Sequence, residues 1–193
     1  MLPMPKLWTE TVEAHRHEVR MAIMDTTANL VAEQGLRSVT MSEIAVRTGI
    51  GRATLYKYFP DVDAILLAWH QRHIQSHLQH LAEVRDETDQ PGERLQRVLE
   101  TFAHHAHESR SHRENELAGM LHRGEHMEAV QQDLTQFIKG ILQEEAGAGR
   151  IRSDVSPDEL AEYCIHALSA AANLKTRAAV KRLVTVTLSA LKD

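Results

Sequence analysis

The sequence predicts an all-α protein with a small amino-terminal domain followed by a larger carboxy-terminal one. Its 193 residues are rich in the helix formers Ala, Leu, Glu, Gln and Arg, and they include only 5 prolines and 4% aromatic residues. Apolar residues recur every three or four positions along most of the chain, which is the spacing of one helix face. Capping residues, glycines and prolines divide the chain into about nine such segments.

The amino-terminal segments form a predicted helix-turn-helix domain of three helices. The first helix is expected to begin between Thr9 and Glu13 and to end near Gln34. Thr40 and Glu43 have the spacing of a capping box, which predicts a second helix over residues 41–48. A turn with a glycine in the left-handed conformation follows, and a third helix is expected over residues 52–58. Two short helices joined by such a turn are typical of a motif whose second helix enters the major groove of DNA.

The segment TMSEIAVRTGIGRATLYKYF, residues 40–59, resembles the amino-terminal domain of TetR-family transcriptional regulators. The agreement in spacing and residue type extends over roughly 45 residues. The chain differs from the family at Gly51, where Ser or Thr is usual, and at Val62, where a phosphate-binding lysine is frequent. The resemblance implies a DNA-binding domain over residues 10–60 and a ligand-binding and dimerisation domain over residues 61–193. It also implies a dimeric, ligand-responsive repressor of a palindromic operator, and not an enzyme.

Six further helices are predicted in the carboxy-terminal domain. They are expected over residues 62–86, 91–108, 111–124, 125–146, 157–173 and 176–191. The clearest helix start is Ser156-Pro157-Asp158-Glu159, which combines an N-cap, a proline in the first turn and a capping-box glutamate.

The resemblance implies three sets of functional residues. The DNA contacts are expected from Thr40, Arg47, Arg52, Ala53, Thr54, Tyr56, Lys57 and Tyr58. The wide apolar stripes of the last two helices imply dimer contacts by Leu160, Cys164, Leu168, Ala171, Val180, Leu183, Val184, Thr187, Leu188 and Leu191. An effector pocket is expected among Trp69, His73, Phe102, His105, Met120, Phe137 and His166. Plain helix packing is the alternative for the last two sets.

The 13 histidines suggest a second hypothesis, a regulator that senses a transition metal or pH. The candidate metal ligands are His70, His73, His77, His105, His122 and His126, although polar filling of the surface and core is the favoured interpretation of these histidines. A histidine-rich helical metalloenzyme is the alternative from another class. The chain contains no Glu-x-x-His pair, nucleophile elbow or phosphate loop, so we expect no enzymatic activity and no required cofactor.

Charge and composition predict a cytoplasmic protein whose amino-terminal end faces the DNA phosphates. Residues 1–60 carry 7 Lys+Arg and 6 Asp+Glu, whereas residues 61–193 carry 15 and 21. Cys164 is the single cysteine, which excludes an intrachain disulfide framework. No stretch is apolar enough for a signal peptide or a membrane span, so we expect no membrane partner.

Overall fold

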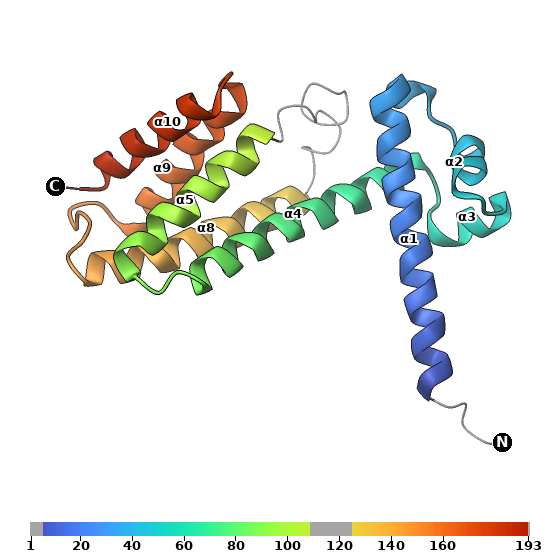
Figure 1. The fold of residues 1–193 in the computed structure, drawn as a ribbon, viewed down its shortest axis with the longest axis horizontal. Coiled ribbons are helices and arrows are strands. Elements are labelled where there is room, and N and C mark those ends of the chain that lie inside the picture. The colour runs from blue at the N-terminus through green and yellow to red at the C-terminus, as the bar shows by residue number, and fades with distance from the viewer. Residues whose placement is uncertain (1–5, 109–124, 193) are drawn as a thin grey trace. The chain divides into compact units, whose positions relative to one another are not determined.

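The computed structural model describes residues 6–108 and 125–192, and all regular structure within them is helical. The chain divides into two compact units, Met1–His73 and Ile74–Asp193. One long helix, α4 (Val62–Asp86), begins in the first unit and ends in the second (Figure 1). The predicted all-α fold is confirmed, with eight α-helices and two short 3-10 helices in the described parts of the chain.

The first unit has its helix ends where glycine and capping residues predict them. Its elements, in order, are α1 (Lys6–Gln34), the 3-10 helix η1 (Leu36–Ser38), α2 (Met41–Thr48), α3 (Arg52–Tyr58) and the start of α4. Gly35, just after α1, and Gly49, just after α2, have φ angles of 82° and 70°, which glycine adopts without strain. The helix α1 begins at Lys6, earlier than the predicted start between Thr9 and Glu13.

Apolar side chains from each α-helix of the first unit meet in one core. Its fully buried members include Ile23 and Leu30 of α1, Ile44 of α2, Leu55 of α3 and Ile65 of α4. Burying a side chain of this size stabilises the fold by about 1.5–3 kcal/mol. The helix α2 contacts both α1 and α3, and the burial of Leu55 covers the inner side of α3.

The second unit is a helical bundle around α5. It contains the end of α4, followed by α5 (Pro91–Glu108), α8 (Glu125–Gly147), α9 (Pro157–Ser169), the 3-10 helix η2 (Ala170–Asn173) and α10 (Arg177–Ala190). The helix α5 contacts α8, α9, η2 and α10. The predicted helix over residues 157–173 is divided, because the α-helix ends at Ser169 and continues as η2. The helix predicted over residues 111–124 lies outside the described residues.

Two polar arrangements fix the connection from α8 to α9. The buried carboxylate of Glu145 accepts hydrogen bonds from Nε and Nη2 of Arg150, at 2.7 and 3.0 Å. These bonds raise the pKa of Arg150, and they supply the partner that a buried carboxylate requires. Ser156 and Glu159 form the predicted capping box at the start of α9, and the hydrogen bonds from Ser156 lower the pKa of Glu159. None of the described helices is both long and apolar enough to cross a membrane.

Candidate DNA interface

The cap of α2 combines a local hydrogen bond with a tie to α1. Thr40 has an extended backbone, and its hydroxyl accepts a hydrogen bond from the amide of Glu43 at 3.3 Å. The carboxylate of Glu43 accepts from the side-chain amide of Gln34 at 2.9 Å. The structure thus forms the threonine half of the predicted capping box, while the carboxylate of Glu43 joins α2 to the end of α1.

The turn between α2 and α3 is built on two glycines. Gly49 is in the left-handed conformation, and the amide of Ile50 donates to the carbonyl of Ala45 at 3.1 Å. Gly51 is extended and caps α3 without a side-chain hydrogen bond, while its carbonyl accepts from the amide of Leu55 at 3.0 Å. This geometry sets the direction in which α3 leaves the turn.

One side of α3 is buried and the rest is exposed. Leu55 is fully buried, whereas Tyr58 is half-buried at the end of the helix. The exposed residues are Arg52, Ala53, Thr54, Tyr56 and Lys57. The Cζ atom of Arg52 lies 5.8 Å from the centre of the Tyr56 ring, so a cation and an aromatic ring stand together on this surface.

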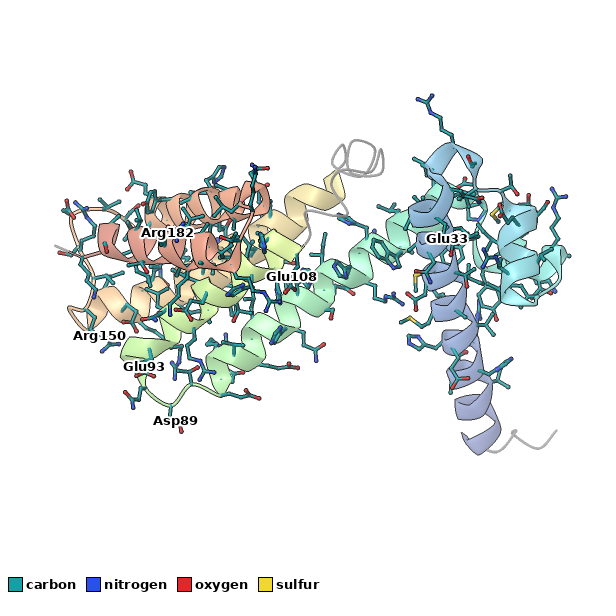
Figure 2. All side chains as sticks on the ribbon, turned by 45° about the horizontal axis from the view of Figure 1, so that its top comes forward. Glu33, Asp89, Glu93, Glu108, Arg150 and Arg182 are labelled. Carbon is teal, nitrogen blue, oxygen red and sulfur yellow. The ribbon has the colours of Figure 1, made fainter. Side chains whose placement is uncertain are left out.

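Carboxylates of α1 neutralise two arginines of the first unit. Arg47 Nη2 on α2 lies 2.8 Å from a carboxylate oxygen of Glu33, near the carboxy-terminal end of α1 (Figure 2). Arg72 on α4 is bonded to Asp25. Within the described residues, no carboxylate forms an ion pair with Arg52 or Lys57 on α3. Arg52 and Lys57 of α3 are therefore available to a phosphate, whereas the expected phosphate contact of Arg47 competes with Glu33.

The sequence pattern of bacterial regulatory proteins of the tetR family matches residues 23–69. The pattern for the C-terminal domain of SbtR-like transcriptional regulators matches residues 90–193, more than half of the chain. The chain belongs to the TetR family. Members of this family are DNA-binding transcriptional regulators, and the helix-turn-helix of α2 and α3 lies within the first match.

Individual relatives agree with the family assignment over different lengths. The regulator EthR of Mycobacterium tuberculosis is 34% identical over 93 residues, which cover 44% of this chain and 42% of EthR. A transcriptional regulator of Staphylococcus aureus is 30% identical over 70 residues, 36% of this chain and 38% of that protein. The chain thus matches less than half the length of these curated relatives.

Solved structures share the fold over nearly the whole chain. A TetR/AcrR-family regulator from Thermobifida fusca has a TM-score of 0.74 at 17% identity, covering 90% of this chain and 98% of that one. FadR of Bacillus subtilis, solved in complex with stearoyl-CoA, has a TM-score of 0.64 at 17% identity and covers 88% of this chain and 98% of FadR.

The residues expected to line an effector pocket separate into several groups. Phe102, His105 and Phe137 are half-buried side chains of the second unit. Trp69 and His73 belong to the first unit, and their rings stack with centroids 5.4 Å apart. Met120 lies outside the described residues. His166 does not fit a pocket wall, because its side chain is 69% exposed and bonds to its own helix at Glu162.

Three imidazoles of the second unit form a contact cluster without the geometry of a metal site. The rings of His77 and His105 stack with centroids 4.2 Å apart, and His80 Nδ1 lies 3.1 Å from His105 Nε2. The ring nitrogens of His80 and His105 that face each other are at hydrogen-bond distance, so one donates to the other. Over residues 6–108 and 125–192, no group of three or more His, Cys, Asp or Glu side chains could hold a metal.

The other metal candidates add no ligand set. His70 and His73 are half-buried on α4 within the first unit. His122 and the side chain of His126 lie outside the described residues. The part of the chain that the structure describes therefore does not favour the metal-sensing hypothesis.

Most of the residues predicted to form the dimer interface belong to the core of a single chain. Those buried within one chain are Leu160, Cys164, Leu168, Ala171, Val180, Val184, Thr187 and Leu191. Leu183 and Leu188 are half-buried and pack against the same core. The apolar stripes of α9 and α10 pack against helices of their own chain, so a direct role of these eight buried side chains in a dimer stays a prediction.

Other residues of α9 and α10 face outward. Tyr163 is 41% exposed and Val186 is 63% exposed. Ala167 of α9 and Ala170 at the start of η2 follow Tyr163 at the four- and seven-residue spacing of one helix side. Each of these outward residues lies only one or two positions from a buried residue of the same stripe. The sequence feature that points to them is therefore an apolar stripe wider than packing against one core requires.

Proposed function

We propose that this protein is a homodimeric, cytoplasmic transcriptional repressor that binds a palindromic operator and is released from it by a small-molecule effector. The exposed surface of α3, with Arg52 and Lys57 outside any ion pair of the described residues, is the observation that supports DNA reading most directly. Arg52 contacts a guanine edge through its guanidinium fork, with Thr54 and Tyr56 as further base contacts. Thr40, Tyr58 and Lys57 hold phosphates around the reading helix, and Ala53 permits close approach.

The homodimer is proposed to form through the outward sides of α9 and α10. These sides carry Tyr163 and Ala167 on α9, Ala170 at the start of η2, and Leu183, Val186 and Ala190 on α10. Large apolar side chains left exposed on neighbouring helices of a folded bundle favour a protein partner. A two-fold dimer presents two copies of α3, and such dimers read half-sites about one DNA turn apart.

The effector is proposed to bind in the second unit beside the half-buried rings of Phe102, His105 and Phe137. Two TetR-fold structures support an organic ligand, since FadR of Bacillus subtilis was solved with stearoyl-CoA and SmeT with triclosan. To release DNA, the effector binds more tightly to a conformer whose reading helices are wrongly spaced for the operator. The continuous helix α4 joins both units and is the proposed route of this coupling.

Selection of bound sequences from a random duplex library by the purified protein tests this function. Recovery of a palindrome, with binding lost in the Arg52→Ala variant, is the expected result. Addition of candidate organic molecules to the recovered complex then screens for the effector. A folded dimer that enriches no sequence at low salt would contradict the proposal.

A further inference from the structure

The amino-terminal part of α1 extends beyond the core of the first unit. Residues 12–18 and Arg20 are exposed, and Val19 and Met21 are half-buried. The first fully buried side chain is Ile23. The match to the TetR family also begins at residue 23. Figure 1 shows this part of α1 running past α2 and α3 with no other element of the first unit beside it. Helices of this kind gain most of their stability from packing, so a partner surface is the natural complement.

The arginines on this extension, like Arg52 and Lys57 of α3, lie outside the ion pairs of the first unit. Arg16 and Arg20 are four residues apart, so they lie on the same side of α1. Neither forms an ion pair with a carboxylate of the described residues, whereas Arg47 and Arg72 both do. Glu13 precedes Arg16 by three residues and Arg20 by seven, so this carboxylate lies on the same side of α1, whereas Glu18 lies on the opposite side of the helix from Arg20.

Arg20 also connects the extension to the reading helix. Its Cζ atom lies 4.3 Å from the centre of the Phe59 ring, and Phe59 is the C-cap residue directly after α3. Arg20 therefore stands at the carboxy-terminal end of α3, next to the predicted phosphate contact Tyr58. Arg16 lies one helical turn, about 5.4 Å, farther out along α1.

We propose that the extension of α1 is a second DNA-binding element, in which Arg16 and Arg20 contact phosphates just outside the base pairs that α3 reads. Two guanidinium groups on one helix side, adjacent to the end of a reading helix, complement the charge of the flanking DNA backbone. The proposal rests on the proposed operator binding and adds to it an anchor that carries no sequence preference. If this anchor exists, affinity depends on how far the duplex extends beyond the palindrome.

Salt-dependent binding of defined duplexes tests the anchor. Wild type, Arg16→Gln and Lys175→Gln are compared on the selected operator with long flanks and on a duplex trimmed to the palindrome. Lys175 is an exposed cation of the second unit, so its variant changes net charge by the same amount. Arg20→Lys, which retains the charge but loses the guanidinium above Phe59, separates charge from stacking.

The anchor predicts a specific pattern of results. With long flanks, Arg16→Gln removes one phosphate contact from each protomer of the dimer, so the slope of log affinity against log salt becomes shallower by about two, while the base preference is unchanged. On the trimmed duplex, wild type and Arg16→Gln bind alike, and Lys175→Gln behaves as wild type on both. Equal affinity and equal slope of wild type and Arg16→Gln on the long duplex would overturn the anchor and leave operator binding intact. Failure of wild type to select any DNA would overturn both proposals.

Discussion

The guanidinium carbon of Arg52 lies 5.8 Å from the centre of the Tyr56 ring, one turn farther along α3. This contact restricts an exposed arginine at the start of the reading helix to one side of α3. Less side-chain entropy is then lost when Arg52 binds a base edge. We propose that the pair positions one cation for the major groove in a domain that has little net charge.

Arg52 and Tyr58 are predicted to differ in what they contribute to DNA binding. Arg52→Ala removes about 1–3 kcal/mol of discrimination between the operator and single-base variants, because its fork reads a guanine edge. Tyr58→Phe weakens binding to all sequences about equally, because its hydroxyl contacts a phosphate. Affinities for the operator and a set of point variants of it measure both effects. Equal loss of preference in the two variants would contradict this division.

Release of Arg47 from Glu33 is predicted to strengthen DNA binding. Glu33→Gln removes a carboxylate from the helix-turn-helix surface and frees the guanidinium that it holds at 2.8 Å. Both side chains are more than half exposed, so the free energy of unfolding should change by less than about 1 kcal/mol. Binding in low and high salt checks this, with a steeper salt dependence expected for the variant. A variant that binds DNA more weakly while unfolding normally would contradict the prediction.

A side-chain cap is predicted to stabilise α3. A Cβ atom at Gly51 would meet only Thr54 Oγ1, at 3.7 Å, so Gly51→Ser fits without strain. The serine hydroxyl can accept a hydrogen bond from a backbone amide in the first turn of α3. The variant should therefore gain about 0.5 kcal/mol in unfolding free energy. Gly49→Ser is the matched control, which should lose stability because Gly49 has a φ of 70°. Thermal melts of both variants provide the measurement.

Local capping signals in the sequence predicted most helix boundaries, because they act over three or four residues. Gly49 and the capping box of Ser156 are examples in which residue type and spacing suffice. Contacts between distant segments could not be obtained in this way. The pairing of Arg47 with Glu33 depends on how α2 lies against α1, which no local pattern specifies.

The dimer face shows a second limit of sequence reasoning. Helical periodicity correctly marked Leu168 and Val180 as members of apolar stripes, but periodicity does not state which surface covers a stripe. The structure assigns both residues to the core of one chain. The side of α10 that remains available to a partner is identified only by exposed neighbours such as Val186, which is 63% exposed.

Val186 and Leu168 are predicted to affect different properties. Val186→Glu places a charge on the proposed dimer face and should produce a folded monomer with weak operator binding. Leu168→Ala opens a cavity in the core and should lower the unfolding free energy by about 2–5 kcal/mol without changing the assembly of the folded protein. Sedimentation equilibrium and thermal melts separate the two. A Val186→Glu variant that remains a stable dimer would exclude α10 as the interface.

Cys164 is predicted to report unfolding of the second unit. Its side chain is fully buried, and burial raises the pKa of the thiol from 9.0 to about 12. The native thiol should therefore resist thiol reagents at pH 8 and react only as the unit unfolds. Since the folded pKa is the higher one, this thiol favours folding most below pH 9, and its contribution is lost as pH rises toward 12. Fast labelling of the native protein would contradict this prediction.

The spacing of half-sites in the selected operator tests the two-fold reading mechanism most directly. Affinity is measured for the operator itself and for a version with about half a helical turn, roughly 5 base pairs, inserted at its centre. The account predicts that the insertion reduces affinity to that of an isolated half-site, because the second copy of α3 then faces the wrong side of the duplex. Unchanged affinity after the insertion would contradict a rigid dimer that reads both half-sites together.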